Sequence, residues 1–288
     1  MIYKHKIIIT SEINNLIEKS LSEDLFIGDI TTESLIPISN IGKAIIIAKS
    51  DGILAGTDIF IEIFRKVNPN IKINKLINEA KEFYKHNIIF EISGSIASIL
   101  QAERTALNFL QRISGIATTT NLFCKKIEPY KAKIIDTRKT VPGLRELDKY
   151  GVRIGGGLNH RFSLGDGILI KDTHINIMRN QGLKLRDIIK KTKMNISHNN
   201  KIEIEVETLE DLKEAIDAKV DTVMLDNMSI KDMYKAVEIC QGKVLLEASG
   251  GVNLDNVKDI AKTGVDLISV GEITHSVKTV DLSLKFTG

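Results

Sequence analysis

The sequence predicts an α/β protein with a parallel, barrel-like sheet, and three observations support this class. The second half repeats an apolar, β-branched run that ends in a polar residue and precedes a helix start signal. Glu205, Asp226 and Glu247 close three such runs at intervals of 21 residues, as expected if each occupies the same place in a successive βα unit. Residues 1 to about 110 lack this repeat and are predicted to form a separate α+β layer. A chain of 288 residues has room for both domains.

The first half and its connection to the second contain a few strong local signals. Apolar periodicity predicts helices over residues 11–22 and 59–67 and strands over residues 43–49 and 88–92. A long helix over residues 95–126, interrupted at Gly115, is expected to join the two halves. No flexible linker separates them, so we expect the domains to pack firmly.

Seven candidate strands follow the joining helix. They cover residues 133–136, 151–154, 167–171, 202–206, 222–225, 244–246 and 267–270. Sequential βα units imply a parallel sheet with helices outside it. A doubly wound sheet is the alternative, but its glycine loop would follow the first strand, whereas the glycine pairs here come late in the chain. A barrel therefore fits better.

Helices are predicted over residues 209–218, 230–240 and 254–262. Thr208, Ser229 and Asn253 precede them as N-cap residues. Asp211 and Asp232 follow the first two caps at the third position, in a variant of the capping box.

Composition excludes several function classes. Forty Lys and Arg against thirty-seven Asp and Glu give a net charge of +3, unlike the clustered charge of a nucleic-acid-binding protein. No apolar stretch approaches the roughly 20 residues of a membrane span. Cys124 and Cys240 are too few for a disulfide framework and are interpreted as packing residues of a cytoplasmic protein.

Polar residues at the predicted strand ends suggest chemistry, because barrel active sites lie at the carboxyl ends of the strands. These residues are Asp136, Arg138, Lys139, Lys171, Asp172, Glu205, Asp226 and Glu247, with glycine loops at Ser249, Gly250, Gly251 and Gly271. Cations, carboxylates and glycine-rich loops together describe a pocket for a phosphorylated polyanion with a divalent metal.

Each signal has an ordinary structural explanation when taken singly. Residues 155–157 are three glycines that could form a simple turn, and His160 and His174 could be surface histidines. Arg104 on the joining helix could be solvated or salt-bridged. Glu203, Glu205 and Glu207 alternate with Ile and Val, so they share one side of a strand, which inside a barrel would require cationic or metal partners.

Nine segments together resemble quinolinate phosphoribosyltransferases. They are EDLFIGDITT (23–32), ERTALNFLQRISGIAT (103–118), DTRKTVPGLR (136–145), GGGLNHR (155–161), LIKDTH (169–174), EIEVET (203–208), VMLDN (223–227), EASGG (247–251) and SVGEITHS (269–276). They occur in the order and spacing of the family and cover nearly the whole chain.

The resemblance implies an N-terminal α/β sandwich domain, residues 1–110 joined by residues 277–288, and an open seven-stranded α/β barrel over residues 111–276. It also implies a homodimer with sites at the subunit interface. The implied activity is that of a carboxylating nicotinate-nucleotide diphosphorylase, a pentosyltransferase of NAD biosynthesis. Such an enzyme converts quinolinate and phosphoribosyl pyrophosphate to nicotinate mononucleotide, pyrophosphate and CO₂.

The resemblance also implies roles for individual residues. Thr137, Arg138, Lys139, His160 and Arg161 would hold quinolinate, with Arg104 reaching in from the partner subunit. Lys171, Glu205, Asp226, Ser249, Gly250, Gly251 and Gly271 would surround phosphoribosyl pyrophosphate and Mg²⁺, with Glu205 and Asp226 nearest the metal. Lys139, Lys171, Glu205 and Asp226 are the expected catalytic residues. Thr173 and Glu272 depart from the family, which usually has Asn and a small residue there.

Three other functions stay open at this point. A barrel aldolase would form a Schiff base on Lys171. A molybdate-transport-associated homologue shares the family fold, although the NHR and KDTH segments favour quinolinate. A non-catalytic ligand-binding barrel is the third, and the presence of both Glu205 and Asp226 argues against it.

Overall fold

The computed structural model describes residues 7–287, which divide into two compact units. The first contains the described residues up to Asn121, residues 141–156 and the described residues from Val277 onward. The second contains residues 122–140 and 157–276. Within residues 7–287 no helix is both long and apolar enough to cross a membrane.

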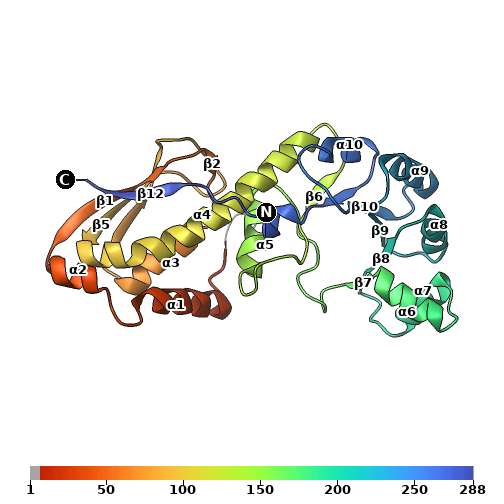
Figure 1. Ribbon diagram of the computed structural model, residues 1–288, viewed down its shortest axis with the longest axis horizontal. Helices are drawn as coiled ribbons and strands as arrows, with labels where there is room; N and C mark the ends of the chain where they lie inside the picture. The colour runs from red at the N-terminus through yellow and green to blue at the C-terminus, as the bar shows by residue number, and fades with distance from the viewer. Residues whose placement is uncertain (1–6, 288) are drawn as a thin grey trace. The chain divides into compact units, whose positions relative to one another are not determined.

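An antiparallel sheet with the strand order β12-β1-β5-β3 forms the centre of the first unit (Figure 1). These strands are β1 (Ile41–Ala48), β3 (Lys72–Lys75), β5 (Ile88–Ser95) and β12 (Leu282–Phe286), and β2 (Gly52–Ile53) pairs separately with β4 (Glu82–Phe83). The helices of this unit are α1 (Ser11–Leu25), α2 (Ile30–Leu35), α3 (Thr57–Val67), the first part of α4 (Ile96–Ile127) and α5 (Arg145–Ile154). In the core, the ring of Phe60 (α3) stacks on the ring of Phe90 (β5), with the ring centroids 4.5 Å apart.

The helix α4 is continuous, so the predicted interruption at Gly115 is wrong. Gly115 has a packing role instead. A Cβ atom at this position would lie 2.5 Å from the carbonyl oxygen of Lys278 and 2.9 Å from the Cα of Thr279. Glycine thus lets the chain segment before β12 lie directly against the helix, and this contact explains a residue that local propensity disfavours.

A parallel sheet with the order β6-β11-β10-β9-β8-β7 forms the second unit, which confirms the predicted α/β class (Figure 1). Its strands are β6 (Lys133–Ile135), β7 (Ile168–Ile170), β8 (Ile202–Val206), β9 (Thr222–Asp226), β10 (Leu245–Ser249) and β11 (Leu267–Ser269). The helices between them are α6 (Asp172–Asn180), α7 (Leu185–Met194), α8 (Leu209–Asp217), α9 (Ile230–Cys240) and α10 (Val257–Lys262), with α11 (Glu272–His275) after β11.

The predicted strand at residues 151–154 is wrong, because these residues end helix α5 (Arg145–Ile154) of the first unit. Leu147, Tyr150 and Ile154 are buried at helical spacing, and this longer pattern overrides the short apolar run. Gly151 also suits a helix contact, since a Cβ there would lie 3.0 Å from the Ile113 carbonyl oxygen of α4. Six strands are therefore assigned to the parallel sheet over residues 7–287, with a single parallel bridge between Ile135 and Leu158 where the chain passes β6.

Two of the three predicted N-caps are confirmed. The hydroxyls of Thr208 and Ser229 accept from the amides of Asp211 and Asp232 at 3.1 Å each. Asn253 does not cap α10, which begins after Asn256; its side-chain oxygen accepts from the amides of Asp255 and Asn256 in the preceding turn. The two cysteines are packing residues as predicted: Cys240 is buried, and burial raises the pKa of the Cys124 thiol to about 11.

Candidate active site

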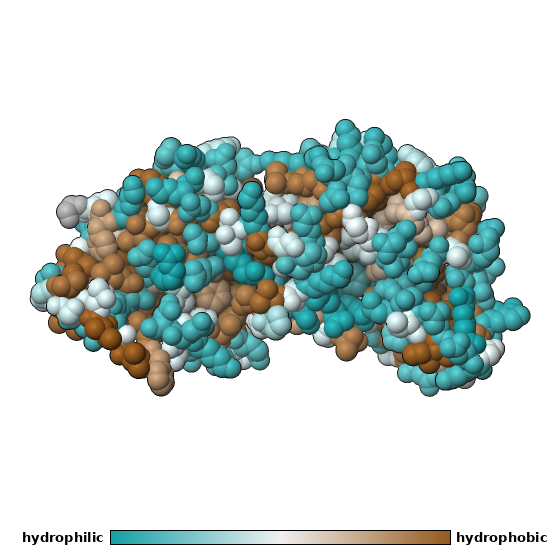
Figure 2. Space-filling view, in the orientation of Figure 1, coloured by the Kyte–Doolittle hydropathy of each residue, from teal (hydrophilic) through white to brown (hydrophobic). Residues whose placement is uncertain are grey.

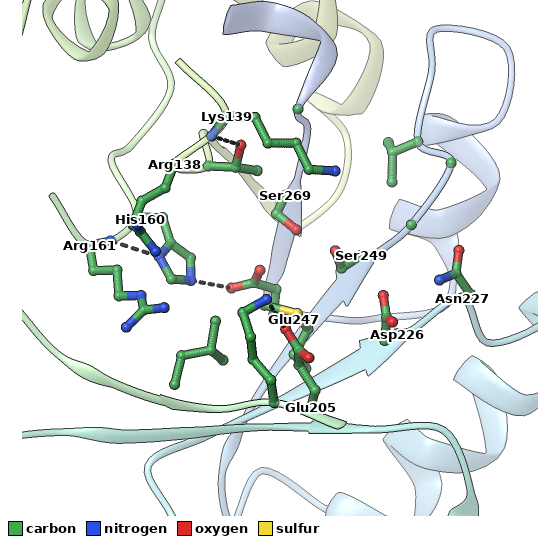
Figure 3. Close-up of a pocket in the computed structure, with 18 of the residues that line it drawn as sticks. Arg138, Lys139, His160, Arg161, Glu205, Asp226, Asn227, Glu247, Ser249 and Ser269 are labelled. Carbon is green, nitrogen blue, oxygen red and sulfur yellow. Dashed lines mark hydrogen bonds and ion pairs between the residues drawn. The ribbon is translucent and has the colours of Figure 1, made fainter. Parts of the chain in front are cut away.

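A cavity of about 890 Å³ opens at the carboxyl ends of the parallel strands and gathers most of the predicted site residues. Its lining includes Thr137, Arg138, Lys139, His160, Arg161, Lys171, Glu205, Asp226, Ser249, Gly250, Gly251 and Gly271. Figure 3 shows Arg138 and Arg161 on one side, Asp226 and Ser249 on the other, and Glu205 and Glu247 between them. Residues from six strand-end segments thus converge on one space.

The strand register corrects the expectation that Glu205, Asp226 and Glu247 occupy equivalent places. Glu205 and Glu247 both pair with Met224, one on each side of β9. Asp226 pairs with Ser249, two residues nearer the carboxyl ends. Because parallel strands pair residues on the same face, all of these side chains face the cavity. The acidic residues form two levels, with Glu205 and Glu247 deep and Asp226 at the rim.

The cationic side of the cavity is built on the loops after β6 and before β7. The Thr137 hydroxyl accepts from the Lys139 amide at 3.0 Å, and the Lys139 carbonyl accepts from the Thr274 hydroxyl at 2.8 Å. Burial, and then repulsion from Arg138, lower the pKa of Arg161. Among the described residues, the buried Nε of Arg138 has no hydrogen-bond partner, which favours an anionic ligand at this side.

Lys171 and Glu205 form an ion pair that joins the two sides. The Lys171 Nζ lies 3.1 Å from Glu205 Oε1, and the Asp172 amide donates to Glu205 Oε2 at 3.3 Å. His174 is exposed, as its structural explanation predicted, and its Nδ1 accepts from the Lys171 amide at 2.9 Å at the start of α6. The side chain of His174 therefore holds the Lys171 backbone and does not line the cavity.

The glycine loop after β10 requires glycine at one position for two separate reasons. Gly250 has φ +97°, a conformation that side chains disfavour. A Cβ there would also lie only 2.1 Å from Asn227 Oδ1. Gly251 has φ +57°, and a Cβ there would meet no atom within 4 Å. The Ser249 carbonyl accepts from the Asn227 amide at 2.9 Å, so the β9 and β10 loops are joined beside the cavity.

Several lining residues were not predicted as site residues. They include Leu169, Met224, Asn227, Val252, Ser269 and His275. Asp172 and Glu247, named among the strand-end polar residues but given no role, also line the cavity. Glu247 was visible in the 21-residue spacing, while Met224 and Ser269 became identifiable only through the sheet register. Glu272 lines the cavity beside Gly271, and Thr173 is exposed outside the lining.

A second cluster of acidic residues lies behind the cavity. Glu203 Oε2 is 2.9 Å from His160 Nε2, and Glu247 Oε2 is 3.9 Å from the same atom. Glu247 is 1% exposed, and burial, followed by repulsion from Glu203, raises the pKa of its carboxyl well above the ordinary range. Glu203 and Glu205 face inward on β8, where cationic or metal partners were expected: Glu205 pairs with Lys171, and Glu203 lies beside the His160 ring. Glu207 follows the strand and is exposed.

Arg104 is the one predicted site residue outside this unit. It lies on α4 in the first unit, with its side chain 63% exposed and 4.0 Å from Glu103. Within its own unit the Arg104 side chain is therefore solvent-exposed and makes only a weak ion pair.

Comparison with known proteins identifies the family. Residues 29–114 match the N-terminal domain model of quinolinate phosphoribosyl transferase, and residues 116–285 match its C-terminal domain model. The chain is 43% identical to a probable carboxylating nicotinate-nucleotide pyrophosphorylase of Methanocaldococcus jannaschii, over 93% of this chain and 95% of that protein. It is 39% identical to the corresponding probable enzyme of Bacillus subtilis, over 96% and 94% of the two chains.

Solved structures agree with the sequence matches. The nicotinate-nucleotide pyrophosphorylase from Francisella tularensis superposes with a TM-score of 0.93 at 43% identity, covering 99% of both chains. The corresponding protein from Ehrlichia chaffeensis gives a TM-score of 0.89 at 38% identity, covering 95% of this chain and 98% of that one. Matched over both of its domains, this chain belongs to the quinolinate phosphoribosyltransferase family.

Proposed function

We propose that the cavity binds quinolinate beside phosphoribosyl pyrophosphate and transfers the phosphoribosyl group to the pyridine nitrogen, with loss of CO₂. The observation that carries this proposal is the arrangement of charge. Arg138, Lys139 and Arg161 line one side of the space, and Asp226 faces them beside a glycine loop. A dicarboxylate and a sugar diphosphate are the two ligands that these sides fit.

Quinolinate supplies its own nucleophile, so no catalytic Ser or Cys is needed. The ring nitrogen attacks the anomeric carbon while the bond to pyrophosphate breaks through an oxocarbenium-like state. The alkylated nitrogen is then positive and stabilises the electron pair left on the adjacent ring carbon when its carboxylate leaves as CO₂. A proton taken up by that carbon completes nicotinate mononucleotide. The task of the protein is to hold two anions together and to stabilise developing charge.

The cations are assigned to quinolinate. Arg138 and Arg161 carry guanidinium groups, which suit carboxylates. The Nε of Arg138 has no hydrogen-bond partner in the described residues, so its N–H group can donate to a substrate carboxylate. Lys139, next to Arg138 in the loop after β6, adds a third positive charge to the cavity lining. The hydroxyl of Thr137 accepts from the Lys139 amide and can still donate its own proton to a carboxylate.

The opposite side is assigned to phosphoribosyl pyrophosphate. Lys171 offsets phosphate charge, and backbone amides around Ser249, Gly250, Gly251 and Gly271 lie where side chains do not block a phosphate. Glu205 and Asp226 are assigned to the ribose hydroxyls and to the cationic ribosyl centre. Lys139, Lys171, Glu205 and Asp226 are thus the proposed catalytic residues.

The donor set on this side also fits Mg²⁺, which prefers carboxylate oxygens. The Asp226 carboxylate has no hydrogen bond or ion pair within the described part of the chain, whereas Glu205 is engaged by Lys171 and the Asp172 amide. Asp226 is therefore the better ligand, and Glu205 would take part only after releasing Lys171. Bound Mg²⁺ would neutralise charge on the leaving pyrophosphate.

A homodimer in which Arg104 serves the partner's site is part of the proposal. The exposed guanidinium of Arg104 supports it, since within its own unit this cation has only a weak partner. Apolar residues also gather on the surface around α2 and the loop before it (Figure 2). These are Phe26, Ile27, Ile30, Leu35, Ile38 and Ile41, which are 70–87% exposed. Such a patch is typical of a surface covered by another protein.

The cytoplasmic location of the protein stays a prediction.

The Schiff-base alternative is disfavoured by the geometry around Lys171. The Lys171 Nζ lies 3.1 Å from Glu205 Oε1, and it would have to leave this partner before it could attack a carbonyl carbon. The proposed function is tested by incubating the purified protein with quinolinate, phosphoribosyl pyrophosphate and Mg²⁺ and measuring nicotinate mononucleotide and CO₂. Formation of both in equal amounts supports the proposal, and the absence of both refutes it.

A further inference from the structure

Lys171 stands at the N-cap of helix α6, where a lysine is a poor choice for the helix itself. The N-cap side chain normally accepts from the amide of the third helical residue, as Thr208 does for α8 and Ser229 does for α9. A lysine side chain contains only donors, and Lys171 makes no such side-chain cap. Helix α6 therefore needs an acceptor from another residue.

His174 supplies this acceptor. Its Nδ1 accepts from the Lys171 amide at 2.9 Å, in the place that Glu or Gln usually takes at the third helical position of a capping box. The Lys171 carbonyl accepts from the amide of Ile175 at 3.0 Å, and the Ile175 side chain is buried. Both polar groups of the Lys171 backbone are thus bound within the first turn of α6.

The carboxylate of Glu205 contacts the same turn from β8. One of its oxygens accepts from Lys171 Nζ at 3.1 Å, and the other accepts from the Asp172 amide at 3.3 Å. The Lys171 side chain is 44% exposed, whereas that of Glu205 is 9% exposed and belongs to a paired strand. Lys171 is therefore the member of this ion pair that can turn toward a ligand in the cavity.

Ligand binding removes one of the two restraints on Lys171. In the proposed function Lys171 Nζ offsets phosphate charge, and Glu205 is assigned to the ribose hydroxyls, so the ion pair between them opens. The hydrogen bond from the Lys171 amide to His174 lies outside the cavity lining and does not have to break. His174 then holds the backbone from which the long Lys171 side chain reaches the phosphate.

We propose that His174 is a positioning residue for phosphoribosyl pyrophosphate, because it fixes the backbone that carries Lys171. This inference rests on the proposed function, in which Lys171 meets a phosphate. His174 is exposed and does not line the cavity, so it acts through Lys171 without touching the substrate. A histidine that could be an ordinary surface residue thus becomes a determinant of substrate affinity.

Helix α7 offers a matched control. It also begins after a lysine, Lys184, and the side chain of Asp187 at the third helical position accepts from the Lys184 amide at 3.1 Å. Neither Lys184 nor Asp187 lines the cavity. Asp187→Leu removes the same kind of helix cap as His174→Phe, but away from the substrate.

Two substitutions of His174 test whether the acceptor matters. His174→Phe keeps a ring but loses the acceptor, whereas in His174→Asn the side-chain oxygen takes the place of Nδ1. Calorimetry with phosphoribosyl pyrophosphate and Mg²⁺ should show about fivefold weaker binding for His174→Phe, the effect of one capping hydrogen bond, and a change within about twofold for His174→Asn. Quinolinate affinity should stay unchanged in both variants. Equal losses in the Phe and Asn variants overturn the proposal.

The control variant separates positioning from helix stability. Asp187→Leu should lower the Tm and leave the affinity for phosphoribosyl pyrophosphate unchanged. If Asp187→Leu weakens this binding as much as His174→Phe does, the effect follows from the stability of the helices and the proposal is wrong.

Lys171→Ala links the inference to the substrate. Combined with Lys171→Ala, His174→Phe should cause no further loss of affinity, because it acts through the Lys171 side chain. Additive losses overturn the proposal. If Lys171→Ala alone leaves the affinity unchanged, the phosphate assignment in the proposed function fails as well. A loss in Lys171→Ala without one in His174→Phe overturns only the role of His174.

Nuclear magnetic resonance of the unsubstituted protein tests the contact without any risk of misfolding. In ¹⁵N-labelled protein, a scalar coupling across the hydrogen bond should join the Lys171 amide nitrogen to His174 Nδ1. The coupling should be present both without ligand and with phosphoribosyl pyrophosphate and Mg²⁺ bound. Loss of the coupling in the complex overturns the proposal, since His174 would then not hold Lys171 when the substrate is present.

Discussion

The two sides of the cavity are built in different ways. The carboxylates Glu205, Asp226 and Glu247 lie on strands, where ladder pairing with neighbouring strands sets their positions. The cations Arg138, Lys139 and Arg161 lie on loops. In these loops the Lys139 amide donates to the Thr137 hydroxyl, the Arg161 amide to His160 Nδ1 and the His160 amide to Asp136 Oδ1. The acidic side therefore has little freedom to move, while the cationic side depends on a few supporting residues. We expect substitutions to affect substrate affinity at the loops and turnover or stability at the strands.

Substrate discrimination should show the largest effect, and it probes the cationic side. Nicotinate lacks the second carboxylate of quinolinate, so binding it would leave cations such as Arg138 and Arg161 without the carboxylate that they are assigned to hold. A site built for a polar group rejects analogues that lack it by roughly 10⁴-fold, and we expect a difference of that order in kcat/KM. Parallel assays with both acids measure it. Equal turnover would refute the assignment of these arginines.

Loss of a single cation comes next and also tests the dimer. Arg104→Ala and Lys139→Ala homodimers should each lose about 10²-fold or more in activity. Mixing them after dissociation should restore about a quarter of wild-type activity, since half of randomly re-formed dimers are mixed and each has one intact site of two. Mass spectrometry verifies the exchange. Exchange without recovery would place Arg104 in its own subunit's site or outside any site.

Asp226→Asn is the corresponding test on the acidic side. It should lower kcat by about 10²-fold while quinolinate affinity changes little, because Asp226 is assigned to the ribose and metal. Steady-state kinetics gives kcat, and calorimetry gives the quinolinate affinity. The opposite result, lost quinolinate affinity with normal saturated turnover, would move Asp226 to the dicarboxylate pocket.

Two neighbouring glycines test the geometry of the presumed phosphate loop. Gly250→Ala forces a Cβ against Asn227 Oδ1 and keeps an unfavourable φ, so the loop must shift. We expect the KM for phosphoribosyl pyrophosphate to rise by about tenfold. Gly251→Ala is the matched variant, with a positive φ but open space around the new methyl group, and should have a smaller effect. Equal effects would show that backbone conformation matters more than the Asn227 contact.

The smallest expected effect concerns stability. The raised pKa of Glu247 means that the folded protein binds the carboxyl proton of Glu247 more tightly than the unfolded chain does. The stabilisation that results is complete below the ordinary carboxyl pKa. It is lost as pH rises through the raised pKa of the folded state. Glu247→Gln does not titrate. It should therefore raise the Tm by about 2–4 °C at pH 8. The gain should shrink toward pH 4.5 in thermal melts. A gain that does not vary with pH would assign the effect to packing.

Local patterns in the sequence predicted many elements of the second unit. The predicted strand at residues 202–206 matches β8, and the predicted helix at residues 230–240 matches α9. The apolar runs and the cap at Ser229 are short-range signals that need no knowledge of distant contacts. The placement of polar residues at strand ends likewise anticipated most of the cavity lining, because parallel strands bring their carboxyl ends to one edge.

Other features depended on contacts between distant parts of the chain. Gly115 looked like a helix break, and residues 151–154 looked like a strand, until packing against residues 278–279 and against α4 gave each a different structure. The two levels of the acidic residues required the sheet register. The position of the His160 ring between the Arg161 amide and Glu203 also required the tertiary structure.

The sequence by itself determined the α/β class, the order of the elements and the chemical character of the site, since these depend on local periodicity, caps and residue type. Only the tertiary structure decided which glycine bends the chain, which glycine allows close packing and which carboxylates lie deep. The physical reason is that burial, register and hydrogen-bond direction are properties of pairs of residues far apart in the chain, and a single local pattern does not contain them.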